Sequence, residues 1–167
     1  MPLMSAVFVV LLLAGCASDG EVSHKLEYCC GPPGPALSNY SLALVNVPGF
    51  LLPYLRDELQ PALLAKGLTQ VNADPTALVT LTYSEVYPDA DEPLPQDGFA
   101  DPMLSARSRR FIAVVTLEIR RADDGAEILR GTLSRMHTVS VGEYMHPKAR
   151  RPIRMGFDQL LKRLPQP

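Results

Sequence analysis

Two adjacent cysteines, Cys29 and Cys30, are the residues whose type and spacing most directly suggest chemistry. Neighbouring Cα atoms are about 3.8 Å apart, whereas the Cα atoms of disulfide-bonded cysteines are usually about 4.4–6.8 Å apart. A bond between these two cysteines would therefore be strained and easily reduced. Three interpretations follow: a redox-labile disulfide, a vicinal disulfide that only rigidifies its own segment, or disulfides that join two chains.

The histidines and serines form no recognisable catalytic or metal-binding pattern. His24 is distant in sequence from the other two histidines, and His137 and His146 are nine residues apart, which is not a metal-ligand spacing. The sequence contains no nucleophile elbow, P-loop, zinc-protease or dinucleotide-binding signature. We therefore expect no catalytic residue, no metal and no cofactor, and we expect the protein not to be an enzyme.

Four basic side chains near the C-terminus form a second candidate site: Lys148, Arg150, Arg151 and Arg154. A helix that begins near Pro152 would place the positive end of its dipole beside them. Cations at that end are each disfavoured by about 0.3–1 kcal/mol, so four together predict a bound anion. The anion could come from the acidic residues of segment 89–101 or from the phosphates of phospholipid or lipopolysaccharide.

The N-terminal residues resemble a bacterial lipoprotein signal peptide. Their apolar run is too short to span a membrane, and it ends in Leu13-Ala14-Gly15-Cys16, which resembles a lipobox. The resemblance implies that residues 1–15 are removed and that Cys16 receives acyl chains, two or more of which make a stable membrane anchor. Because Ala17 and not aspartate follows Cys16, the resemblance also implies the periplasmic face of the outer membrane.

Length and composition favour a single domain outside the nucleic-acid-binding classes. The chain has 167 residues, 47% of them hydrophobic and 20% charged, and a net charge of −2, which excludes a broadly basic surface. Residues 16–41 contain glycines and prolines with little apolar periodicity and are expected to form a lipidated tether. We expect the folded domain over residues 42–167, interrupted by a proline-rich acidic loop at 87–109.

Apolar periodicity within that domain predicts an α+β fold. The expected elements are a strand at 42–47, a helix at 51–66 that is kinked or broken at Pro61, strands at 77–86, 110–121 and 127–137, and a helix at 152–163. The turn Asp123-Asp124-Gly125 predicts a hairpin between the last two strands. The order β-α-β-β-β-α predicts a mixed four-stranded sheet with one parallel crossover and with both helices on one face.

Two parts of this region resemble a family of bacterial lipoproteins that share a domain of unknown function. The first part is Leu64-Ala65-Lys66-Gly67-Leu68 together with the strand that begins at Ala77, and the second is the hairpin from Leu117 to Gly131. The resemblance covers roughly residues 42–164. It implies a location in the cell envelope and no established chemistry.

These observations predict a lipid-anchored, non-catalytic binding or accessory module of the bacterial envelope. Its expected partners are the membrane, through Cys16, and an envelope protein or anionic lipid, and we expect no nucleic acid. The alternative is an auxiliary lipoprotein of an envelope lipid or lipopolysaccharide transport system, which would present an apolar groove to acyl chains. A periplasmic hydrolase or redox enzyme would follow only if the cysteine pair or a histidine pair lined a pocket.

Overall fold

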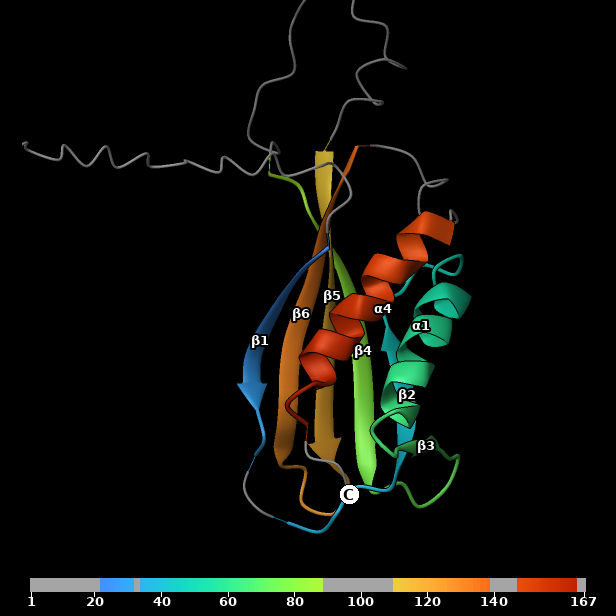
Figure 1. Cartoon of the computed structure of the whole chain (residues 1–167), viewed down its shortest axis with the longest axis vertical. Coiled ribbons are helices and arrows are strands. Elements are labelled where there is room, and N and C mark those ends of the chain that lie inside the picture. The colour runs from blue at the N-terminus through green and yellow to red at the C-terminus, as the bar shows by residue number, and fades with distance from the viewer. Residues whose placement is uncertain (1–21, 32–33, 89–109, 139–146, 165–167) are drawn as a thin grey trace, which may run out of the picture.

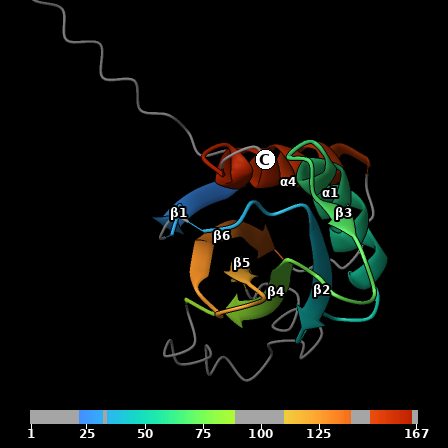
Figure 2. The same cartoon turned by 90° about the horizontal axis from the view of Figure 1, so that it is seen from below.

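Six strands form one mixed sheet, and two helices cover one of its faces (Figures 1 and 2). The computed structural model describes residues 22–31, 34–88, 110–138 and 147–164. The elements are β1 (Ser23–Cys29), β2 (Asn39–Val45), α1 (Leu52–Leu64), β3 (Thr69–Gln70), β4 (Ala77–Val86), β5 (Arg110–Arg121), β6 (Glu127–Thr138) and α4 (Pro147–Leu161). The strand order is β1-β6-β5-β4-β2-β3. Figure 2 shows the sheet curved like a trough whose open side the helices cover.

The α+β class and the central connections agree with the sequence-based prediction. Strand β2 pairs with β4 in parallel, with α1 between them in the chain, and β4, β5 and β6 pair antiparallel in succession. On β5, alternate side chains from Ala113 to Ile119 are buried against the helices. Gly125 has a φ of 71°, so the hairpin turn uses the left-handed conformation that favours glycine.

The prediction of four strands is wrong, because the sheet also contains β1 and β3. Strand β1 lies inside the segment expected to be a tether and pairs antiparallel with β6, so the folded part reaches back to residue 23. Its side chains are mostly exposed, and an edge strand of this kind shows no apolar alternation in its sequence. Strand β3 has only two residues, too few to produce a pattern.

The helices also differ from the prediction in their details. Helix α1 continues without a break through Pro61. It ends before Gly67, whose φ is 78°, and there the Leu68 N–H donates to the Leu63 carbonyl. Helix α4 begins at Pro147, five residues before the expected start, and contains Pro152. Pro147 occupies the first helical position, where the N–H that proline lacks would have no hydrogen-bond partner.

The core lies between the two helices and the concave face of the sheet. Leu59 and Leu63 of α1 and Phe157 and Leu160 of α4 are fully buried there, as is Leu117 at the centre of β5. The expected signal peptide, Cys16, most of loop 87–109 and His146 lie outside the described residues, as do the side chains of His137, Lys148 and Arg150. The candidate site described next comes from β1, β6, α1 and the two ends of α4.

Candidate functional site

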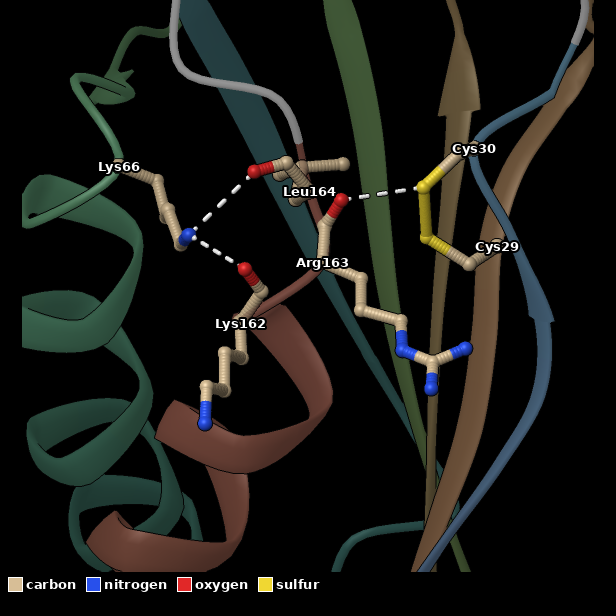
Figure 3. Close-up of a disulfide and its surroundings, with 6 residues drawn as sticks. All are labelled: Cys29, Cys30, Lys66, Lys162, Arg163 and Leu164. Atoms are coloured by element: carbon tan, nitrogen blue, oxygen red, sulfur yellow. Dashed lines mark hydrogen bonds between the residues drawn. A yellow bond between two sulfur atoms is a disulfide. The ribbon is translucent and has the colours of Figure 1, made fainter.

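The structure joins Cys29 and Cys30 in a vicinal disulfide at the end of β1 (Figure 3). The Cα atoms are 3.7 Å apart, and Cys30 has a φ of 72°. The Cys30 N–H donates to the Ile128 carbonyl at 2.7 Å, so the backbone of β6 holds this conformation. Cys29 is half-buried against the core and Cys30 is exposed. A small thiol would therefore reach the sulfur of Cys30 first.

The disulfide sits on the C-terminal end of α4. The Cys30 Sγ lies 3.0 Å from the Arg163 carbonyl oxygen, and Lys66 Nζ donates to the carbonyls of Lys162 at 3.1 Å and Leu164 at 3.3 Å (Figure 3). The carbonyls of residues 162–164 lie at the negative end of the helix. Two of them accept hydrogen bonds from the Lys66 ammonium, and the third contacts the Cys30 sulfur. A disulfide sulfur carries no hydrogen, so the contact with Arg163 becomes a hydrogen bond only when Cys30 is a thiol.

A redox role for the pair stays a prediction. We expect the variant that combines Cys29→Ser with Cys30→Ser to lose only about 1 kcal/mol of unfolding free energy, since a cross-link that closes so small a loop removes little entropy from the unfolded chain. Urea unfolding followed by circular dichroism measures the difference, with the wild type in reductant as the parallel sample. A loss above about 3 kcal/mol would mean that the disulfide is what holds β1 in the fold.

The structure describes the side chains of two of the four residues in the predicted basic cluster, Arg151 and Arg154. Arg154 Nε lies 2.8 Å from Oε2 of Glu58, which is 3% exposed on α1, so its counter-charge comes from the neighbouring helix. Arg151 is exposed near the start of α4 and has no ion pair among the described residues. Lys148 and Arg150 belong to the first turns of the same helix.

The described arginine side chains of β5 and β6 divide into two groups by position along the sheet. Near the end that carries the disulfide and the hairpin turn, Arg120 and Arg130 pair with Glu118 and Glu127, and Arg121 pairs with the two aspartates of the turn. The hydrogen bond that Arg120 donates to the Glu118 carboxylate raises the pKa of Arg120. Toward the opposite end, Nε and Nη1 of Arg135 are buried without a hydrogen-bond partner in the described part of the chain.

A small apolar cavity of about 20 Å³ adjoins Arg135 and brings distant parts of the chain together. Val22, which precedes β1, and Leu51, which precedes α1, both line it. The remaining residues come from the two helices and from three strands: Tyr54, Leu55, Tyr83, Ala113, Val115, Leu133, Ser134 and Ile153. The start of β1 and the turn before α1 therefore lie side by side.

A larger hollow of about 260 Å³ lies between α1 and the β3 edge of the sheet. Tyr40 lines this hollow. The Tyr40 hydroxyl is buried and has no hydrogen-bond partner among the described residues. Burial raises the pKa of Tyr40. The amides of Gln60 and Gln70 meet at its rim at 3.3 Å. The hollow could not be predicted from the sequence, because β3, which forms one wall, has only two residues and shows no apolar periodicity.

By its fold the chain is an α+β protein with a mixed six-stranded sheet and two helices on one face. It matches no known protein family and no curated protein, so the resemblance to a lipoprotein family with a domain of unknown function gains no support there.

Solved structures with a similar arrangement include the PelC dodecamer from Paraburkholderia phytofirmans, at 12% identity over 83% of this chain and 96% of that chain, with a TM-score of 0.49. Two others are named as lipoproteins. The minor lipoprotein from Acinetobacter baumannii has 17% identity over 75% of this chain and 87% of its own, with a TM-score of 0.37. Rare lipoprotein B from Shewanella oneidensis has 13% identity over 74% and 91%, with a TM-score of 0.40.

Proposed function

We propose that the chain is a bacterial lipoprotein, acylated at Cys16, whose domain is a non-catalytic binding or accessory module at the periplasmic face of the outer membrane. The sequence Leu13-Ala14-Gly15-Cys16 carries this proposal, because it places a lipobox directly after an apolar run. In the described part of the chain, neither helix is long and apolar enough to cross a membrane. Attachment through Cys16 does not require one.

The domain itself offers recognition surfaces. The described cysteines, histidines and carboxylates form no group of three that could hold a metal ion. Three features are suited to binding: the exposed residues of β3 at the sheet edge, the hollow beside Tyr40, and Arg151, which is exposed and has no ion pair among the described residues. These features support a role in binding an envelope partner.

The alternative role, in lipid or lipopolysaccharide transport, calls for an apolar groove that holds acyl chains. The two cavities described above measure about 260 and 20 Å³. Ligand pockets usually measure about 300–1,000 Å³, so neither described cavity reaches that range. The accessory-module proposal needs no such groove.

Metabolic labelling with a palmitate analogue tests the proposal. We expect the wild type to take up the label and to sediment with membranes, and Cys16→Ser to do neither, because the acylated thiol is gone. The variant with Cys29→Ser and Cys30→Ser is the matched control, since it removes the other two cysteines of the chain and should keep the label. A wild type without label, or label that survives Cys16→Ser, would overturn the proposal.

A further inference from the structure

The distance between Cys16 and the folded domain is set by the position of β1. Val22, the first described residue, is only six positions after Cys16, and six Cα–Cα steps span at most about 20 Å. The 26-residue tether expected from composition would have allowed the domain to move several times farther. An acyl anchor on Cys16 therefore holds the start of β1 within about 20 Å of the membrane surface.

The part of the domain around Val22 is here called the proximal end. Besides Val22 it comprises the turn from Pro48 to Leu51, which shares the small cavity with Val22, and the paired row Val86, Ile112 and Met136. The distal end carries the C-terminal ends of α1 and α4 and the turn between β5 and β6 (Figure 1), and the disulfide lies there against the carbonyl of Arg163. Strand β1 runs from the proximal end toward the distal end over seven residues, about 20 Å.

Large apolar side chains are exposed at the proximal end, where a soluble surface would normally present polar groups. Phe50 is 41% exposed, and Val86, Tyr87 and Met136 are exposed as well. The Tyr87 ring packs against Phe111 at 5.9 Å, and the Tyr87 hydroxyl donates to Glu85. An aromatic ring with a polar tip and isolated apolar side chains are suited to the headgroup region of a bilayer.

The described arginine ion pairs of the sheet lie toward the distal end. Arg120, Arg121 and Arg130 pair there with Glu118, Glu127 and the aspartates of the turn, while Arg163, beyond α4, is exposed. At the proximal end, Arg151 is exposed without an ion pair among the described residues. Guanidinium groups bind phosphates well, so an exposed arginine close to an anionic leaflet favours contact with it.

We propose that the proximal end lies on the membrane, with Phe50, Val86, Tyr87 and Met136 in the headgroup region and with Arg151 directed to the phosphates of anionic lipids. This inference rests on the proposed acylation of Cys16. The anchor keeps the surface close to the bilayer, so a patch that is weak on its own is held there by a high effective concentration. The disulfide end then points away from the membrane, toward partners in the periplasm.

Single tryptophans test this orientation, because the chain contains none. Phe50→Trp places a fluorophore at the proximal end, and Leu64→Trp places one at the distal end, where Leu64 is 61% exposed on α1. The full-length acylated variants are reconstituted in vesicles of phosphatidylethanolamine and phosphatidylglycerol with brominated acyl chains. We expect quenching at least about twofold stronger, and bluer emission, for Phe50→Trp than for Leu64→Trp.

Charge reversal separates the electrostatic part of the contact from the apolar part. In the Phe50→Trp background, Arg151→Glu should weaken quenching in vesicles that contain phosphatidylglycerol and not in neutral vesicles. Arg163→Glu reverses another exposed arginine, at the distal end, and should change neither. If Arg163→Glu has the same effect as Arg151→Glu, the charge contact is not at the proximal end and the proposed orientation fails.

The mass of the purified chain distinguishes the two proposals. A chain without acyl groups overturns both the lipoprotein proposal and the membrane contact. An acylated chain in which both tryptophans are quenched equally, or in which Leu64→Trp is quenched more, overturns the membrane contact alone. An acylated chain with the expected ratio supports both.

Discussion

Replacing Arg154 with methionine is expected to lower the free energy of unfolding by about 2–3 kcal/mol. The change leaves the Glu58 carboxylate buried on α1 without the Nε–H donor that lies 2.8 Å away. Removing one partner of a buried ion pair typically costs about 3–5 kcal/mol, and the half-exposed Arg154 side chain places this pair somewhat below that range. Urea unfolding of the two proteins measures the loss.

Two further variants show whether the ion pair is the cause. Arg151→Met removes an exposed arginine of the same helix and should cost less than about 0.5 kcal/mol. Adding Glu58→Gln to Arg154→Met should recover part of the loss, because the buried charge that Arg154 faced is then gone. Equal losses for Arg154→Met and Arg151→Met would show that the contact with Glu58 contributes nothing to stability.

Gly131→Val is expected to cost about 2 kcal/mol and to release β1 from the sheet. A Cβ atom at Gly131 would lie 2.6 Å from Cδ2 of Leu160 in α4 and 3.0 Å from the backbone oxygen of Lys25 in β1. The leucine methyl can turn away, but the backbone of β1 cannot move without losing its pairing with β6. Overpacking of this kind costs about 1–3 kcal/mol.

Amide hydrogen exchange tests whether the loss of stability is confined to β1. The amides of β1 should exchange faster in Gly131→Val, while those of β4 and β5 remain protected. Gly49→Val is the matched control, because a Cβ atom at Gly49 meets nothing within 4 Å, and it should leave β1 unaffected. Unchanged exchange in β1 would mean that Leu160 alone absorbs the added side chain.

Sequence periodicity predicted the strands along which buried and exposed side chains alternate, such as β5. It did not predict β1, along which they do not alternate. On β5 the buried residues from Ala113 to Ile119 occupy alternate positions, so the strand and its inner face followed from the sequence. Strand β1 has exposed side chains on both faces because it lies at the edge of the sheet. Its existence depends on pairing with β6, about a hundred residues later, which no local pattern encodes.

The candidate site divides in the same way. The cysteine pair was identified from its residue types, and the structure adds the carbonyl of Arg163 and the cap by Lys66, both of which depend on how α4 meets β1 and α1. Arg154 was identified as part of a basic cluster, but its partner Glu58 lies 96 residues earlier. The proximal apolar surface escaped the sequence because Phe50, Val86 and Met136 belong to different elements.

The pairing of β1 with β6 also sets the order in which the chain can be completed. The chain is made from its N-terminus, so β1 exists long before residues 127–138 are available to pair with it. Until then β1 has no strand to join, while α1 and the β4–β5 pair can form from closer contacts. Any enzyme that modifies Cys16 while the chain is being made would therefore meet a substrate in which β1 has not yet paired.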